Sequence, residues 1–159
     1  VGIRKDLIND KYKFVFPDGN IETSDIKDFL IDTENKTLDP YRDKTFQKYL
    51  NNKYNKGRFD LDEILKNDYL VLDTRQSDLR LYRGKVPTLR AGRHGILYVK
   101  NGQLKKLSGY ESLLLQGFPE ELAEKTRGMI TESKLLSQAG NAMTVNVVKT
   151  IGDQLLKSL

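Results

Sequence analysis

The sequence predicts an α+β fold, in which a strand-rich middle is followed by helices. The first observation is alternation of apolar and polar residues in short segments between residues 69 and 99, a pattern typical of strands. The second is a change to apolar spacings of three and four residues near the C-terminal end, which is typical of amphipathic helices. Strands and helices in separate runs favour α+β over alternating βα units.

The first part of the chain carries weaker patterns. Residues 1–16 are predicted to be extended, because aromatic residues alternate before a Pro-Asp-Gly turn. A short helix is expected from 23 to 30, since Ser and Thr caps precede it. Residues 33–58 are polar with little period, and we interpret them as a long loop or insert with a weak helix at 45–50. Residues 59–65 form another short helix candidate.

A turn dipeptide separates two of the strands predicted in the middle of the chain. Asn101-Gly102 separates two alternating segments and is the dipeptide most typical of a two-residue hairpin turn, so the segments 96–100 and 103–106 are predicted to pair. The strands predicted before this hairpin are 69–73, 79–82 and 86–89.

Three helices are predicted after the hairpin. Ser108 and Glu111 form a capping-box pattern in front of a run of leucines. The second helix covers 131–139 and is expected to stop at Gly140. The last covers 142–159, with Asn141 as a candidate N-cap. Its predicted apolar face consists of Val145, Val148, Ile151, Leu155 and Leu159.

Length and composition limit the class of protein. The 159 residues suit one domain, or one small domain with an appendage, and 38% hydrophobic content allows a modest core. No run approaches the roughly 18 apolar residues of a membrane span, and no signal-peptide pattern opens the chain. Because there is no cysteine, disulfides, thiolate metal sites and thiol catalysis are excluded. The first residue is Val1, so we expect a piece of a longer chain.

The net charge of +5 is unevenly distributed. The segment 73–106 has a local charge of +7, and the rest of the chain sums to −2. Such a concentration is typical of a polyanion-binding face, although a solvated hairpin surface explains it equally well. Its cations are Arg75, Arg80, Arg83, Lys85, Arg90, Arg93, Lys100, Lys105 and Lys106, against the acids Asp73 and Asp78.

Four short motifs occur in order along the second half of the chain. They are Thr88-Leu89, Leu-Ser-x-x-Glu at 107–111, Leu-Gln-Gly-Phe-Pro at 115–119, and Gln-x-Gly-Asn-Ala at 138–142. In order and rough spacing they resemble the last conserved blocks of the DNA cytosine-C5 methyltransferases. The resemblance covers essentially the whole chain and is weakest over residues 23–67.

The resemblance implies a domain organisation. Residues 1–16 would be a strand leading out of a Rossmann-like catalytic domain that is missing from the chain. Residues 17–119 would be a small twisted β-rich target-recognition domain, and 120–159 a helical segment completing the catalytic domain. The final amphipathic helix would then pack on that missing domain.

The resemblance also implies a division of labour. The family's nucleophile is a Cys in a Pro-Cys block and its acid a Glu in a Glu-Asn-Val block, and this chain contains neither, nor the Gly-rich cofactor loop. We therefore expect no catalytic residue here. The chain would bind double-stranded DNA and read its sequence, while a catalytic domain or subunit transfers a methyl group from S-adenosylmethionine to cytosine. A bacterial cytoplasm and a restriction–modification system are the usual setting, with no membrane or metal involved.

Two sets of site residues follow from the resemblance. Gly140, Asn141, Ala142 and Met143 would help to close the S-adenosylmethionine pocket, since a helix N-terminus offers free N–H groups to a carboxylate; Asn141 as a plain N-cap is the alternative. The DNA-binding candidates are Arg75, Ser77, Asp78, Arg80, Arg83, Thr88, Arg90, Arg93 and His94.

The chemistry of these DNA candidates leaves their individual roles open. An Arg fork can bind guanine or a phosphate, and phosphate contacts are the more common. Ser77 and Asp78 fall near the tip that fills the space of an extruded base in the family; Asp78 could accept from a cytosine amino group or cap a turn. Thr88 could contact the DNA backbone or be an ordinary strand residue. His94 could contact DNA or be a plain loop residue, and one His alone makes no metal site.

One departure from the family pattern concerns the block around Glu111. The family usually has Arg directly before this Glu and often Pro before that, whereas this chain has Tyr110 and Gly109. Because that Arg is thought to brace the recognition domain, bracing here would need other residues. Two other classes of function remain: a stand-alone basic DNA-binding module or non-catalytic subunit, and a pure protein-interaction domain.

Overall fold

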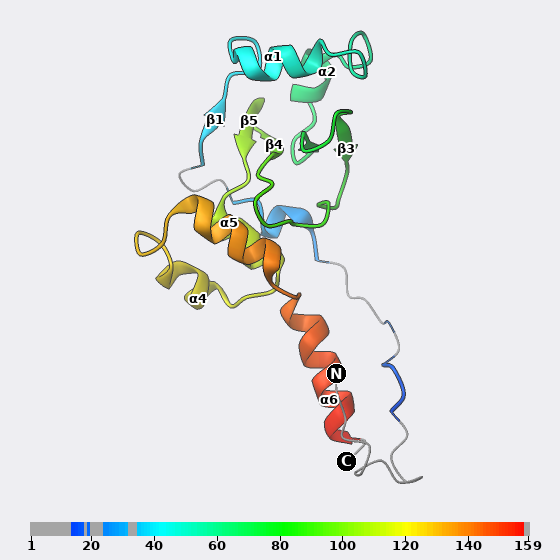
Figure 1. The fold of residues 1–159 in the computed structure, drawn as a ribbon, viewed down its shortest axis with the longest axis vertical. Helices are drawn as coiled ribbons and strands as arrows, with labels where there is room; N and C mark the ends of the chain where they lie inside the picture. The colour runs from blue at the N-terminus through cyan, green and yellow to red at the C-terminus, as the bar shows by residue number, and fades with distance from the viewer. Residues whose placement is uncertain (1–13, 18, 20–23, 32–34, 158–159) are drawn as a thin grey trace. The chain divides into compact units, whose positions relative to one another are not determined.

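The computed structural model describes residues 14–17, 19, 24–31 and 35–157 (Figure 1). Two compact units are present, one formed by Ser24–Ala142 and the other by the chain on either side of it. The predicted extended opening lies almost wholly outside the described residues. The predicted helix near 23–30 is a single 3-10 turn, η2 (Ile26–Asp28), capped by the Asp25 side chain.

A five-stranded antiparallel sheet forms the centre of the 24–142 unit, in the order β1-β5-β4-β2-β3. An α+β fold is therefore confirmed. The strands are β1 (Thr37–Leu38), β2 (Val71–Asp73), β3 (Arg80–Tyr82), β4 (Ile96–Lys100) and β5 (Gln103–Lys106). The sequence pattern had not indicated β1, which pairs with β5 at the edge of the sheet.

The strand predicted at 86–89 is wrong. Gly84, at φ +64°, turns the chain after β3, and Pro87 has no N–H to donate to a ladder. The carbonyl of Thr88 accepts from a side chain, the Arg75 guanidinium, instead of a neighbouring strand. Val86 and Leu89 still pack against the core, so their apolar character serves a loop that covers the sheet.

The central strands are buried on both faces of the sheet. Successive side chains of a strand point to opposite faces, so one strand contributes to two core clusters. Leu72, Leu97 and Val99 belong to a core cluster with residues of α1 and α2. Val71 and Tyr98 belong to a second cluster on the other face. Figure 1 shows α1 and α2 on one side of the strands and α4 and α5 on the opposite side.

Six α-helices are described. α1 (Lys44–Leu50) confirms the weak helix predicted at 45–50 in the insert, and α2 (Leu61–Leu65) confirms the short helix predicted at 59–65; each begins at an Asp N-cap. The helices that follow the sheet are α3 (Gly109–Leu115), α4 (Glu120–Lys125), α5 (Glu132–Asn141) and α6 (Val145–Lys157). Tyr110, Leu113, Ala123, Leu135 and Ala139 make a third core cluster among α3, α4 and α5.

Two local predictions, the hairpin turn and the capping box, are confirmed in detail. Asn101 and Gly102 both have positive φ, as the two-residue turn between β4 and β5 requires. The capping box of Ser108 and Glu111 starts α3. The Gln-Gly-Phe-Pro motif ends it: Gly117, at φ +81°, donates to the Leu114 carbonyl at 2.8 Å, and Phe118 donates to Leu113 at 3.1 Å. This is a Schellman motif.

The boundary between the last two helices differs from the prediction. α5 continues through Gly140 and ends at Asn141, so Asn141 is the last residue of a helix and not the N-cap of the next. The chain leaves α5 at Ala142, whose backbone is extended, and α6 begins at Val145. Gly140 remains helical, and its lack of a side chain leaves room for the backbone at Arg90 and Ala91.

The other unit contains α6, which is amphipathic as predicted. Its residues are at most half-buried within the described structure, and Val147, Val148 and Leu156 are exposed. No helix among the described residues is long and apolar enough to span a membrane.

Candidate functional site

The DNA-binding candidates predicted from the sequence lie on two loops and on β3. Loop A (residues 74–79) joins β2 to β3, and loop B (residues 83–95) joins β3 to β4. Asp73, the last residue of β2, pairs with both Arg80 and Ile96, so loop A and the end of loop B leave the sheet at the same point. The register of three antiparallel strands therefore brings together residues that are distant in sequence.

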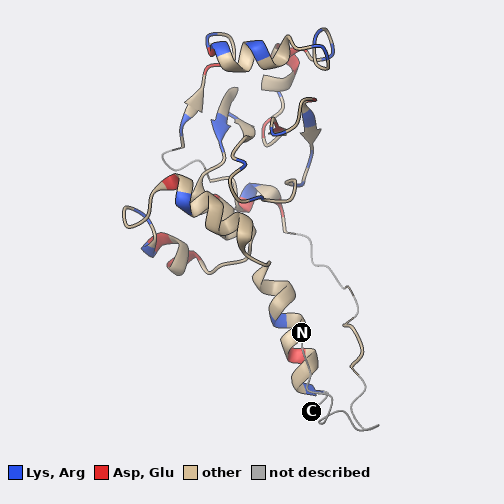
Figure 2. Ribbon diagram, in the orientation of Figure 1, with Lys and Arg blue, Asp and Glu red and all other residues tan. Residues whose placement is uncertain are grey.

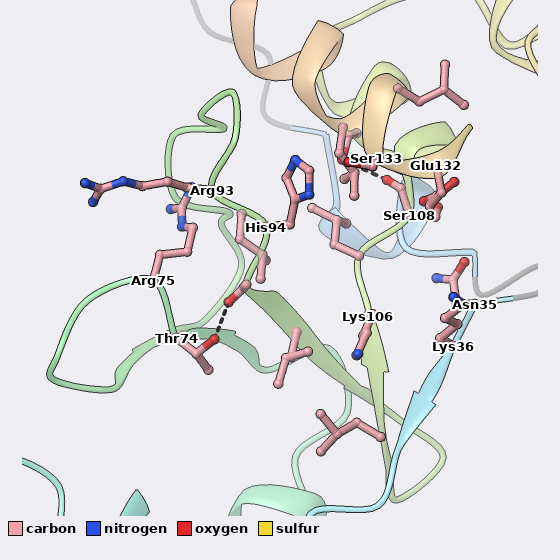
Figure 3. Close-up of a pocket in the computed structure, with 18 of the residues that line it drawn as sticks. Asn35, Lys36, Thr74, Arg75, Arg93, His94, Lys106, Ser108, Glu132 and Ser133 are labelled. Atoms are coloured by element: carbon pink, nitrogen blue, oxygen red, sulfur yellow. Dashed lines mark hydrogen bonds between the residues drawn. The ribbon is translucent and has the colours of Figure 1, made fainter. Parts of the chain in front are cut away.

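Arg75 links the two loops. Its guanidinium makes a two-pronged ion pair with Asp73, at 2.7 and 2.8 Å, and donates to the Thr88 carbonyl at 2.8 Å. Both partners of the ion pair keep only 6% of their side chains exposed. The Thr74 N–H and hydroxyl add a second link by donating to the Gly95 carbonyl, at 2.8 and 2.9 Å (Figure 3). Arg75 thus organises the loops from inside the protein.

This buried ion pair predicts acid sensitivity. Burial by itself would raise the pKa of Asp73, but the hydrogen bonds and charge of Arg75 outweigh it and hold the pKa below its ordinary value. A carboxyl whose folded pKa is depressed stabilises the fold above its unfolded pKa of about 4, and this contribution is lost as pH falls through the folded value. In urea unfolding we expect Asp73→Asn to be less stable than wild type at pH 7, with a smaller further loss at pH 3.

The exposed Asp28→Asn variant is the control for that experiment, and it should keep the acid sensitivity of the wild type. If Asp73→Asn and wild type lose the same free energy of unfolding between pH 7 and pH 3, the acid sensitivity does not come from Asp73.

Most of the remaining candidates are accessible. Arg80 is exposed and forms an ion pair with Asp78 at 3.2 Å, whose pKa is lowered chiefly by that hydrogen bond. Arg83 donates to the Asn67 side chain at 2.8 Å. The exposed Arg80–Asp78 ion pair contributes little to stability and can be exchanged for a phosphate contact. The exposed candidates are Ser77, Arg80, Arg83, Thr88, Arg90, Arg93 and His94, while Asp78 is half-buried.

Loop B also forms one wall of a cavity of about 890 Å³ within the 24–142 unit. Figure 3 shows Arg93 and His94 on the loop, with Lys106, Ser108 and Ser133 across from it. The Nε2 atom of His94 lies 3.4 Å from the Ser137 hydroxyl. The cationic lining consists of Lys36, Arg75, Arg90, Arg93, Lys106 and Arg127, against the acids Asp43 and Glu132. This composition suits an anionic group such as a phosphate.

Sequence reasoning missed several of these lining residues, among them Lys36 and Ser133. Lys36 precedes the unpredicted strand β1, and Ser133 lies in α5. No local pattern marks either residue, because only the fold brings them beside loop B. Figure 2 shows Lys and Arg on the strands and on α1, and also on α5 and α6, with acidic residues gathered on α4.

The last two sequence motifs are hydrogen-bonded to each other. The Gln116 amide, 9% exposed, donates to the carbonyl of Ala139 at 2.7 Å and of Ala142 at 3.3 Å. The Gln-Gly-Phe-Pro block therefore holds the end of α5, where Gly140 and Asn141 lie. An ideal Cβ at Gly140 would come within 2.3 Å of the backbone between Arg90 and Ala91. The Gly in Gly-Asn-Ala is thus required for α5 to contact loop B.

The cofactor candidates differ in their exposure. Asn141 is exposed at the end of α5, and Gly140 and Ala142 are half-buried. Met143, which belongs to the other unit, has 69% of its surface exposed.

Gly109 and Tyr110 stand where the family usually has Pro and Arg, and both pack at the contacts of α3 with α4 and α5. Gly109 lets α3 cross α5 closely, since a Cβ there would lie 2.4 Å from Leu135 Cβ. Tyr110 is buried, which raises the pKa of its phenol, and it donates to Glu120 at 3.3 Å. The Arg127 guanidinium lies over the Tyr110 ring at 4.1 Å from its centroid, so a cation braces this helix junction from elsewhere in the sequence.

The part of the chain that the structure describes holds no group of three His, Cys, Asp or Glu side chains that could bind a metal ion.

A comparison with family models gives a match over nearly the whole chain. The model for C-5 cytosine-specific DNA methylase matches residues 1–157. No curated protein and no solved structure matches the sequence. The motifs and the near-complete family match agree: the chain belongs to the family of C-5 cytosine-specific DNA methylases.

Proposed function

We propose that this chain is the C-terminal, target-recognition part of a DNA cytosine-C5 methyltransferase. It would grip duplex DNA and read its sequence while a separate catalytic part performs the methyl transfer. The observation that carries the proposal is the convergence of loop A and loop B at one end of the sheet, with Ser77, Arg80, Thr88 and Arg93 exposed on or beside them. Exposed Arg and hydroxyl groups on adjoining loops suit contacts to phosphates and base edges.

The nine DNA-binding candidates take two roles in this proposal. Arg75 positions the loops through Asp73 and Thr88, because its side chain is almost fully enclosed. The other candidates would contact DNA, with Arg80 and Asp78 exchanging their mutual ion pair for contacts to the duplex. The cavity beside loop B would take a phosphate of the same duplex.

The methyl donor would be S-adenosylmethionine, which supplies an activated methyl group. Among the cofactor candidates, Asn141 offers an exposed side-chain amide, and Gln116 holds the turn at Ala142. These residues fit one wall of a binding site, and the remainder would come from the catalytic part. The exposed apolar residues of α6 would then pack on that part.

The sequence contains no cysteine, whereas the family's chemistry uses a cysteine nucleophile, so we expect the chain alone to transfer no methyl group. The chain would be either an excised region of a single-chain enzyme or the smaller partner of a two-chain enzyme, in a bacterial cytoplasm with a restriction–modification role. Methyl transfer from S-adenosylmethionine by the isolated chain would contradict this proposal. Co-elution with a catalytic polypeptide in gel filtration, with restored transfer, would support it.

Binding to duplex DNA as a function of salt tests the recognition role. We expect the logarithm of the association constant to fall linearly with the logarithm of salt concentration. Arg80→Ala and Arg93→Ala should each weaken binding, and each lost phosphate contact should reduce the salt slope by about 1. Lys125→Ala, which removes a charge from the acidic helix α4, is the control and should leave the slope unchanged.

The alternatives give different results in the same experiments. A stand-alone basic DNA-binding module would bind duplex with the same salt dependence but would neither associate with a catalytic polypeptide nor restore transfer. A pure protein-interaction domain would bind no DNA at any salt concentration. The exposed, cationic loops favour the first alternative over the second.

A further inference from the structure

The turn that follows α1 is hydrogen-bonded to loop A. The Asn52 side chain donates to the Ser77 carbonyl at 2.9 Å, and the Asn55 side chain donates to the same carbonyl at 3.2 Å. The Leu79 N–H donates to the Asn55 side-chain oxygen at 2.8 Å. Backbone groups on both sides of Asp78 are therefore held by a segment more than 20 residues earlier in the sequence.

Asn55 is built into this position. It keeps 1% of its surface exposed, and its amide also donates to the Tyr49 carbonyl at 3.0 Å. Its backbone N–H donates to the carbonyl of Asn52, at 3.2 Å, and to the Asn52 side chain, at 3.1 Å. A side-chain amide with one accepted and two donated bonds cannot be replaced by Asp, which has no donor, or by an apolar residue.

The contact sets the direction of loop A. Within loop A, the Leu79 side chain is buried in the core, while Ser77 is exposed. With the Ser77 carbonyl and the Leu79 N–H both fixed, the backbone of Asp78 between them has little freedom. Arg80 directly follows Leu79 and forms an ion pair with Asp78. The insert therefore constrains the backbone from which Asp78 and Arg80 project.

We propose that Asn55, supported by Asn52, is a positioning residue for target-sequence recognition. It contacts no DNA and acts by holding loop A in the conformation in which Asp78 and Arg80 read the duplex. The proposal rests on the proposed function and deepens it, because it assigns a role in specificity to the insert between β1 and β2. A residue of this kind affects discrimination between sequences more than affinity for phosphates, which carry no sequence information.

The test uses the full chain. The wild-type chain first selects a preferred duplex from a randomised pool, and its affinity for that duplex is compared with a scrambled duplex of the same composition. We expect Asn55→Ala and Asn52→Ala each to reduce this ratio about tenfold, the size of one lost base discrimination. Affinity for the scrambled duplex should stay within about twofold of wild type, since phosphate contacts set it.

Controls separate positioning from a general loss of structure. Asn51→Ala removes a neighbouring amide that bonds only to Gln47 among the described residues, and it should keep the wild-type ratio. Asn52→Ala leaves the buried Asn55 in place, so it remains informative if Asn55→Ala does not fold. Amide hydrogen exchange at Leu79 should accelerate in Asn55→Ala more than exchange in β4.

The outcomes are distinguishable. An unchanged ratio in both variants, or a parallel loss of affinity for both duplexes, would overturn the positioning role while leaving the proposed function intact. A wild-type chain that binds duplex with no preferred sequence, or that binds no duplex, would overturn the proposed function and the positioning role with it.

Discussion

Replacing Glu111 with Ala is expected to lower the free energy of unfolding by about 4 kcal/mol. Glu111 is completely buried. Its carboxylate accepts from the Tyr98 hydroxyl at 2.8 Å, from the Asn35 amide at 2.7 Å, and from the Ser108 N–H and hydroxyl at 2.9 and 3.0 Å. These donors come from β4, from the segment before β1 and from the start of α3.

The size of this effect follows from the hydrogen-bond donors that the substitution leaves without an acceptor. Removing the carboxylate deprives the donors of Tyr98, Asn35 and Ser108 of a charged acceptor inside the protein, and each buried group left unsatisfied costs about 1–3 kcal/mol. Tyr98→Phe removes one hydroxyl from the same network and should cost about 1 kcal/mol. The network also joins β4 to the start of α3, so its loss should weaken the packing of α3 against the sheet.

Urea unfolding at pH 7 measures the effect. Glu121→Ala is the matched control: Glu121 lies on α4 with 83% of its side chain exposed, and its loss should change stability by less than about 0.5 kcal/mol. A loss of under 1 kcal/mol in Glu111→Ala would show that the network contributes no more than a surface pair.

Replacing Gly140 with Ala is expected to cost about 3 kcal/mol and to weaken duplex binding. The added Cβ would lie 2.3 Å from the Ala91 nitrogen and from the Arg90 carbonyl carbon. These are backbone atoms, so the overlap cannot be relieved by a rotamer change. Either loop B or α5 must move, although Gln116 holds the end of α5. Arg90 and Arg93 would then be displaced from their places on loop B.

The control is another helical glycine. Gly152 in α6 has no atom within 4 Å of its would-be Cβ, and Gly152→Ala should stabilise that helix by up to about 1 kcal/mol, because Ala has the higher helix propensity. Urea unfolding followed by duplex binding measures both variants. If Gly140→Ala is as stable as wild type and binds duplex equally well, the close contact between α5 and loop B is not required.

Features that depend on neighbours in the sequence were predictable. The Asn101-Gly102 turn needs only residues that accept positive φ, and the capping box needs only Ser108 and Glu111 three residues apart. The end of α3 needs only Gly117 in its left-handed conformation. The capping box and the motif that contains Gly117 also carried part of the family resemblance that the family model bears out over residues 1–157.

The wrong predictions arise where distant residues override local preference. The segment 86–89 has the alternation of a strand, yet the Arg75 guanidinium takes the Thr88 carbonyl and Leu89 packs into two clusters. Glycine commonly ends a helix, yet Gly140 continues α5. Loop B occupies the space that a side chain at this position would fill. In both places a tertiary contact outweighs a propensity of less than about 1 kcal/mol.

The sequence by itself therefore determined the fold class, the hairpin turn, the two ends of α3 and the family, since each is encoded by residues a few positions apart. Only the tertiary structure decided which candidates face outward and which hold the loops. Arg75 is enclosed by Asp73, and loop A is held by Asn55, through pairs whose members approach only when the sheet forms. Hydrogen bonds act over about 3 Å, so their partners are set by folded geometry and not by position in the chain.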